Sequence, residues 1–184
     1  LFLGAIAGYF GGLADDIIMR IMDILQSIPG ILLAITISVV LGPGFFNTLL
    51  ALSIGGIAIG CRLTRASILN IRTQEYLEAA TSINASTSRI ITRHVLPNSF
   101  SPLLVSSTMS IGNVIMAAAM LSFIGLGIQP PTPEWGSMIA GGRNLIRTSP
   151  WMVTFPGIFI MLTVLALNLF GDGLRDALDP KLKK

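Results

Sequence analysis

The stretch EYLEAATSINASTSRIITRHVLPN, residues 75–98, decides how the rest of the chain is arranged. It is the one long polar segment between two very apolar blocks, so we expect it to stand in water and to meet a partner protein there. Local signals predict a first helix over residues 74–83, stopped by Asn84, because asparagine tolerates the left-handed conformation of a helix end. A second helix is predicted over residues 89–95, and Pro97 is expected to end it or to kink it into the next apolar block.

The first of these helices has two features that suit a partner. Tyr76, Ala80 and Ile83 recur at helical spacing and predict one apolar stripe. Ala79 and Ala80 are small, which leaves a slim surface that fits a groove on another protein. The alternative is a solvated loop that only links two membrane spans.

Composition places the chain in a membrane. The 184 residues are 52% hydrophobic and only 11% charged, with a formal net charge of +3, and the mean hydropathy is +0.77. Soluble proteins carry about a quarter charged residues. The single cysteine, Cys61, excludes an internal disulfide and a cysteine-cluster metal site, and a small apolar role in a helix is favoured for it.

Charge-free stretches predict an all-α, polytopic transmembrane bundle of about five spans, the first of them partial, in a single domain. A helix needs about 20 residues to cross the bilayer, so the long apolar stretch before Cys61 must fold back, and Gly42-Pro43-Gly44 is the predicted turn. The predicted spans are residues 1–14 (partial), 26–41, 45–60, 100–124 and 151–170.

The first 27 residues contain two further patterns. Gly4, Gly8 and Gly12 recur every fourth residue, which predicts close approach of a neighbouring helix. Residues 15–27 are amphipathic, and Asp16 is spaced to pair with Arg20. An interfacial helix is favoured there over a catalytic use of the aspartates. The short first span and the absence of an initiator methionine lead us to expect an N-terminally truncated fragment.

The basic residues predict the orientation. Residues 62–98 carry five arginines and are therefore expected in the cytoplasm, together with the tail 171–184. Residues 129–150 form the predicted external loop, which holds only two of the twelve basic residues. Trp135 and Trp151 fit the belt positions of tryptophan at a membrane surface.

The span over residues 100–124 is unusually polar. Its candidate path-lining residues are Ser106, Ser110 and Asn113. Two interpretations stay open: the helix lines a path for a polar solute, or its hydroxyl groups bond to its own backbone or to a neighbouring helix.

The central stretch resembles the EAA loop of ABC importer permeases. Glu78-Ala79-Ala80, then Asn84, then His94 with Leu96-Pro97, follow the family pattern E-A-A-x3-G-x9-I-x-L-P. Asn84 replaces the usual glycine and His94 the usual isoleucine. The segments LSFIGLGIQPPTPEWG, residues 121–136, and GDGLRDALDP, residues 171–180, resemble the dipeptide and oligopeptide branch, which also includes nickel permeases.

The resemblance implies a permease of the type I importer, MetI-like kind in a prokaryotic inner membrane. It implies two ATP-binding subunits, a second homologous permease, an extracytoplasmic solute-binding protein and surrounding lipid as partners, and no nucleic acid. The coupling helix would dock on an ATP-binding subunit. The docking residues carried over by resemblance are Glu78, Ala79, Ala80, Ile83, Asn84, His94, Leu96 and Pro97.

Missing motifs narrow the chemistry. The chain has no G-x-x-x-x-G-K-[S/T] phosphate loop, so ATP hydrolysis is expected in a partner and not in this chain. His94 is the only histidine and has no nearby ligand residues, so no metal or other cofactor is expected. A secondary transporter ranks second, because it would need ionisable residues within its spans. An intramembrane hydrolase ranks third, since it would need a nucleophile paired with a base.

Overall fold

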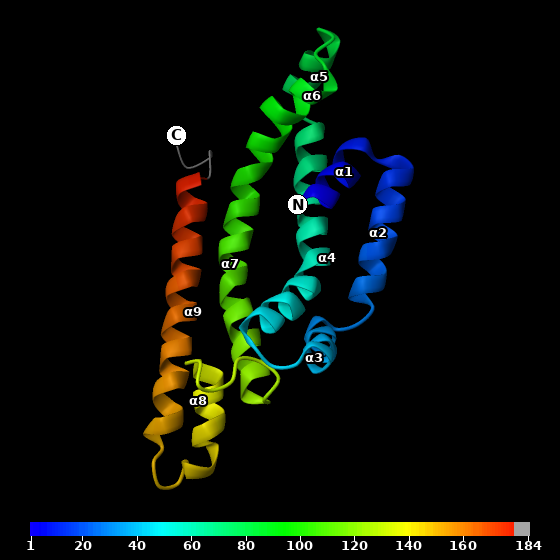
Figure 1. The fold of residues 1–184 in the computed structure, drawn as a ribbon. Helices are drawn as coiled ribbons and strands as arrows, with labels where there is room; N and C mark the ends of the chain where they lie inside the picture. The colour runs from blue at the N-terminus through cyan, green and yellow to red at the C-terminus, as the bar shows by residue number, and fades with distance from the viewer. Residues whose placement is uncertain (179–184) are drawn as a thin grey trace. The chain divides into compact units, whose positions relative to one another are not determined.

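The computed structural model describes residues 1–178, apart from the side chains of Glu78, Thr81, Thr87 and Ser88. The predicted all-α class is confirmed, since helices joined by turns make up the described chain (Figure 1). The elements are α1 (Phe2–Phe10), α2 (Gly12–Gln26), α3 (Gly30–Leu41), α4 (Phe45–Arg72), α5 (Glu75–Ser82), α6 (Thr87–Ile90), a π-helical turn (Ile91–Val95), α7 (Leu96–Phe123), α8 (Trp135–Gly142), a short 3-10 turn (Arg143–Leu145) and α9 (Trp151–Leu178).

Three helices are long and apolar enough to cross a membrane. They are α4, the continuous helix over Ile91–Phe123, and α9. Helices α2 and α3 pass the same test only as a pair, bent at a short break, so the described residues offer a fourth span if that pair is one broken span. Pro29 lies in the break and is the first residue before α3, where its missing N–H leaves no helical bond unmade.

Residue contacts divide the chain into two compact units with interleaved segments. Among the described residues, the first comprises residues 1–27, 57–106 and 177–178, and the second comprises residues 28–56 and 107–176. Helices α4 and α7 therefore each contribute one part to each unit. The stretch with the EAA-like pattern belongs wholly to the first unit.

Helix α1 packs against α4 through two of the three predicted glycines. A Cβ atom on Gly4 would meet the carbonyl oxygen of Cys61, and one on Gly8 would lie 2.9 Å from the carbonyl oxygen of Arg65. Glycine is required at both places because backbone, which cannot move aside, occupies the space. Close approach is thus confirmed for Gly4 and Gly8, whereas Gly12 faces open space.

Helix α2 packs against the same part of α4. Met22 is buried with Ala58 and Cys61, and Ile18 and Leu25 flank this cluster. The pairing of Asp16 with Arg20 expected from their spacing is not among the ion pairs of the described chain, which join α2 to α4 instead. The other two aspartates of α2, Asp15 and Asp23, pair with Arg65 and Arg62 of α4.

The second unit has its own core of Ala34, Ala51 and Leu121. Its helix α7 ends in a left-handed turn, because Gly125 has φ +86°. The amide of Leu126 donates to the Leu121 carbonyl, which is the capping bond of a Schellman motif. This turn lies within the LSFIGLGIQPPTPEWG segment, residues 121–136.

Two glycines allow α8 and α9 to pack closely against α7. A Cβ atom on Gly136 of α8 would meet the carbonyl oxygen of Ala119, and one on Gly112 of α7 would lie 3.1 Å from Val164 of α9. Trp135 stacks on Phe159, with ring centroids 6.2 Å apart. Residues 129–150 thus contain a packed helix, where the sequence predicts only an external loop.

Helices α4 and α9 extend beyond the C-terminal ends of the predicted spans. Helix α4 continues from the predicted end at residue 60 to Arg72, and α9 continues from Phe170 to Leu178. Arginines mark where a span meets water, but they do not stop a helix, and residues 61–72 contain neither glycine nor proline. The arginine-rich segment therefore begins in helix and becomes irregular only after Arg72.

Candidate partner-docking site

Helix α5 is the centre of the candidate site, and a residue in the left-handed conformation follows its C-terminal end. Asn84 has φ +58°, which confirms the conformation predicted for it. The amide of Ala85 donates to the carbonyl of Ala80 at 3.2 Å. This is the 6→1 bond of a Schellman motif, so asparagine serves where the EAA pattern has glycine.

One face of α5 is anchored inside the protein. Leu77 is only 4% exposed and packs with Ile68 of α4, Ile90 of α6 and Val95 of the π-helical turn. Ala80 and Ala85 pack against the edge of this cluster. The inward line of α5 thus runs through Leu77 and Ala80, whereas Tyr76 and Ile83 of the predicted apolar stripe are exposed. Sequence reasoning did not single out Leu77, because the sequence of α5 has apolar residues on two sides.

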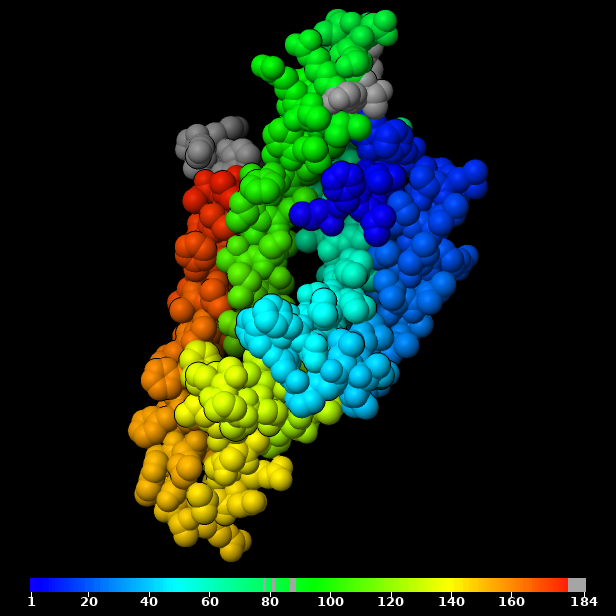
Figure 2. Space-filling model, viewed as in Figure 1, coloured from blue at the N-terminus to red at the C-terminus, as the bar shows by residue number. Residues whose placement is uncertain are grey.

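The opposite face of α5 is open. Ile83 is 81% exposed, Tyr76 is 42% exposed, and Ala79 is also exposed. In Figure 2 the green surface of this segment projects at the top of the view. The side chain of Glu78 lies outside the described residues. An exposed isoleucine beside an alanine, at the tip of a rigid turn, is suited to insertion into a partner's groove.

Tyr76 and His94 form the base of the site. Their ring centroids lie 6.3 Å apart. The Asn98 side-chain amide donates to the His94 carbonyl at 2.7 Å and approaches the Tyr76 hydroxyl at 3.3 Å. His94 is thus a half-buried packing residue between α5 and α7. Asn98, the last residue of the VLPN sequence, is a functional candidate that sequence reasoning did not single out.

Leu96 and Pro97 lie in a continuous helix, so the expectation that Pro97 ends the helix is wrong. The chain passes from α6 through the π-helical turn into α7. In that turn the Leu96 amide bonds back to the Ile91 carbonyl, five residues earlier. The wider turn changes the bonding register just before the proline, which accommodates a residue that cannot donate. Both Leu96 and Pro97 are exposed.

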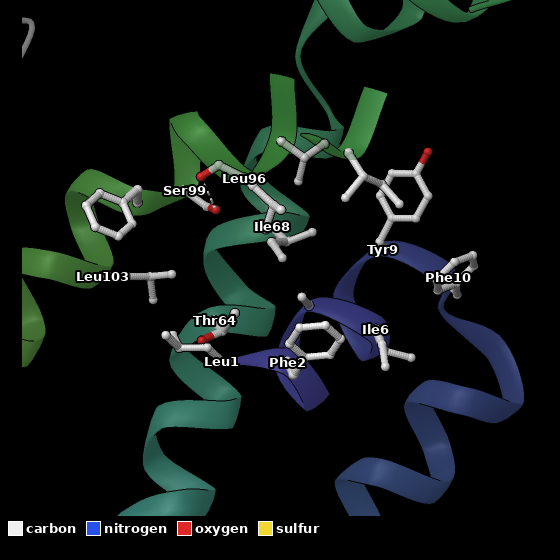
Figure 3. Close-up of a pocket in the computed structure, with 14 residues that line it drawn as sticks. Leu1, Phe2, Ile6, Tyr9, Phe10, Thr64, Ile68, Leu96, Ser99 and Leu103 are labelled. Carbon is white, nitrogen blue, oxygen red and sulfur yellow. Dashed lines mark hydrogen bonds between the residues drawn. The ribbon is translucent and has the colours of Figure 1, made fainter. Parts of the chain in front are cut away.

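An apolar cavity of about 430 Å³ lies next to the buried cluster, between α1, α4 and the start of α7 (Figure 3). Ile68 and Val95 line it and also belong to the cluster that holds Leu77. The Thr64 and Ser99 hydroxyls in its wall donate to the carbonyls of Gly60 and Leu96. These two polar side chains are therefore satisfied within their own helices, and the cavity presents mainly hydrocarbon.

The three candidate path-lining residues share one side of α7. Ser110 and Asn113 are exposed and Ser106 is half-buried, at a spacing of four and three residues. The Ser110 hydroxyl donates to the Ser107 carbonyl at 2.7 Å. That bond is what the second interpretation expects for Ser110, so Asn113 is the stronger candidate to face a solute.

The fold defines a helical membrane protein in which residues 75–98 carry the EAA-like pattern. The family described as "Binding-protein-dependent transport system inner membrane component" matches residues 1–184. The chain belongs to that family, which confirms its resemblance to ABC importer permeases.

Individual relatives agree with this assignment. The "Dipeptide transport system permease protein DppC" of Alkalihalophilus pseudofirmus is 49% identical over 181 residues, covering 98% of this chain and 60% of the relative. The "Di/tripeptide transport system permease protein DppC" of Pseudomonas aeruginosa is 48% identical over 183 residues, covering 100% and 60%. The "Glutathione transport system permease protein GsiD" of Pectobacterium atrosepticum is 50% identical over 181 residues, covering 98% and 60%. The chain thus spans about 60% of the length of these relatives.

Proposed function

We propose that this chain is part of a membrane-spanning subunit of an ATP-driven importer for peptides or similar small solutes. Membership of the inner-membrane component family supports this, as do relatives named as dipeptide and glutathione permeases. The subunit itself does not hydrolyse ATP. It spans the membrane several times, with residues 62–98 and the C-terminal tail in the cytoplasm and residues 129–150 outside.

The single observation that carries the proposal is the division of α5 into two faces. Leu77 and Ala80 face the chain's own cluster, and Ala79 and Ile83 remain free for a partner. A short helix that is anchored on one side transmits a push from the other side to the helices behind it. The partner on the free side is the ATP-binding subunit, and Glu78 and Asn84 complete the docking surface with these residues.

Transport then follows from movement of this helix. ATP binding closes the two ATP-binding subunits, α5 moves with the one that holds it, and Ile68 passes the displacement to α4. A second, homologous permease encloses the path with this chain, and the Ser106, Ser110 and Asn113 side of α7 lines it. A solute-binding protein delivers the solute at residues 129–150, and lipid surrounds the remaining apolar surface.

Disulfide or bifunctional crosslinking tests the docking role. The full-length permease, with Cys61→Ser and its candidate ATP-binding subunit, is prepared with a single cysteine from either Ala79→Cys or Ile83→Cys. We expect crosslinks to the ATP-binding subunit at both positions, with yields that change when ATP is added. Cys61 is buried, so its replacement removes a background thiol that reagents reach poorly in any case.

Leu77→Cys is the matched control, because it lies on the same helix and faces inward. It should give little crosslinking to the partner. If Leu77→Cys crosslinks as well as Ile83→Cys, or if none of the three responds to ATP in a correctly inserted protein, the docking assignment is wrong. A protein that carries no coupling helix would then be the better description, and a secondary transporter would become the leading alternative.

A further inference from the structure

We infer that Asp15 and Arg65 are positioning residues that make α2 move together with the docking segment. Arg65 on α4 donates from Nε and from one terminal nitrogen to the two carboxylate oxygens of Asp15 on α2, both at 2.5 Å. Bidentate charge-assisted pairs of this kind fix both distance and orientation. The inference rests on the proposed function, because it concerns how displacement of α5 spreads into the membrane helices.

The pair is one of two ionic contacts between the same helices. Arg62 of α4 also bonds to Asp23 of α2, at 2.6 Å. Eight residues separate Asp15 from Asp23, so the two contacts hold α2 at points about two helical turns apart. Met22, Ala58 and Cys61 form the apolar contact on the same face. Two separated attachments prevent α2 from pivoting on α4 as it could on one.

The two pairs differ in their surroundings, and this decides which one positions α2. The side chains of Arg65 and Asp15 are 33% and 16% exposed, against 44% and 54% for Arg62 and Asp23. Exposed pairs contribute little because water and salt screen them, whereas a partly buried bidentate pair is screened less. Arg65–Asp15 is therefore the dominant attachment and Arg62–Asp23 the weaker one.

The position of Arg65 links this attachment to the docking segment. Ile68 lies three residues further along α4, on the neighbouring turn, and packs directly against Leu77 of α5. A short chain of contacts thus runs from α5 through Leu77 and Ile68 to Arg65 and then to Asp15. Displacement of α5 reaches α2 through groups that are either packed or doubly hydrogen-bonded.

The test uses the full-length permease assembled with its ATP-binding subunits in lipid nanodiscs. Spin labels at Ile24 of α2 and Ile59 of α4, both exposed positions, report the separation of the two helices. In the unaltered protein we expect one narrow distance distribution that keeps its width with and without ATP. Asp15→Asn should increase the population of separated helices about tenfold, the scale of losing one strong charged pair.

Three further variants distinguish positioning from a merely structural role. The charge exchange Asp15→Arg with Arg65→Asp should restore the narrow distance distribution. Arg65→Lys keeps the positive charge but cannot form the bidentate hydrogen bonds, so it should give a distance distribution of intermediate width. Asp16→Asn is the matched control, since Asp16 is exposed on the same helix and is not part of either ion pair; it should have no effect. If Arg65→Lys or Asp15→Asn leaves the distribution unchanged, the inference is overturned.

A second readout separates this inference from the proposed function. The rate at which maleimide labels a cysteine at Ile17, exposed on α2, should change with ATP in the parent and should lose that response in Asp15→Asn. The Ile83→Cys crosslink to the ATP-binding subunit should persist in both. Persistence of the crosslink and of the full α2 response in Asp15→Asn refutes the positioning role alone, whereas loss of the crosslink in the parent refutes the docking role.

Discussion

Replacing Leu77 by alanine should release the docking helix from the body of the protein. Leu77 is 4% exposed and contacts a cluster formed by Ile68, Ile90 and Val95. Truncating a buried leucine costs about 2–5 kcal/mol, and the cost is lowest where neighbours can fill the space. Ala80 and Ala85 lie at the edge of this cluster and are only partly buried, so we expect about 2–3 kcal/mol here.

This cost should appear as local opening and not as global unfolding. Helix α5 has eight residues, and an isolated helix of that length is not stable in water. Amide hydrogen exchange over residues 75–82, measured on the full-length protein in nanodiscs, reports the opening directly. A change of 2–3 kcal/mol corresponds to roughly 30- to 140-fold lower protection of these amides.

Ile83→Ala is the matched control for this experiment. It also removes an aliphatic side chain from the same segment, but Ile83 is 81% exposed, so exchange should change by less than about twofold. Equal protection in Leu77→Ala and Ile83→Ala would show that α5 is not anchored through Leu77. In crosslinking to the ATP-binding subunit the order should reverse, with Ile83→Ala weakening docking more when the partner concentration is below saturation.

Three other substitutions follow from backbone geometry. Asn84→Ala should destabilise the end of α5 by about 1 kcal/mol because alanine is strained in the left-handed conformation, whereas Asn84→Gly should not. Hydrogen exchange at the Ala85 amide measures the effect of both variants. Gly4→Ala should lower the thermal unfolding midpoint through overpacking of about 1–3 kcal/mol against the Cys61 carbonyl, and Gly56→Ala, which meets open space, should not. Gly136→Ala should also lower the thermal unfolding midpoint, through overpacking against the Ala119 carbonyl, whereas its control Gly141→Ala should not. An equal midpoint for a variant and its control would contradict the packing described.

Local features were predictable where one residue type decides them. Asparagine and glycine are the residues that tolerate a positive φ, so the turn at Asn84 could be located from sequence. Glycines at a spacing of four predict close helix packing, and Gly4 and Gly8 provide it. Gly12 does not, because the chain has already turned at Gly11, which has φ +66°.

The inward face of α5 was not predictable for a physical reason. The helix has apolar residues on two sides, and both Tyr76 with Ala80 and Leu77 with Ala80 satisfy a helical spacing. Only the location of α4 selects between these two faces of α5, because Ile68 of α4 is the residue against which α5 packs. The same holds for Arg65 and Asp15, which are 50 residues apart and meet because α2 and α4 share the Met22 cluster.

Helix length also depended on more than charge. Five arginines over residues 62–93 indicate which part of the chain leaves the membrane. They predict exposure to water and not where the helix ends. A helix ends where its backbone bonds end, and residues 61–72 have no residue that breaks them. As a result, the segment that carries the docking helix is joined to α4 by the two residues Thr73 and Gln74 alone.

If α5 docks on a partner as proposed, this short connection makes the anchoring of α5 important for coupling. A flexible link of many residues would absorb a displacement of the docking helix, whereas two residues leave little slack. Such a link still allows rotation about its bonds, and the Leu77–Ile68 contact removes that freedom. The Arg65–Asp15 pair, one turn before Ile68 on α4, then extends the rigid region to α2. Stiffness from α5 to α2 thus requires both contacts, so Leu77→Ala and Asp15→Asn should each uncouple α2, and the double variant should be no worse than the more severe single one.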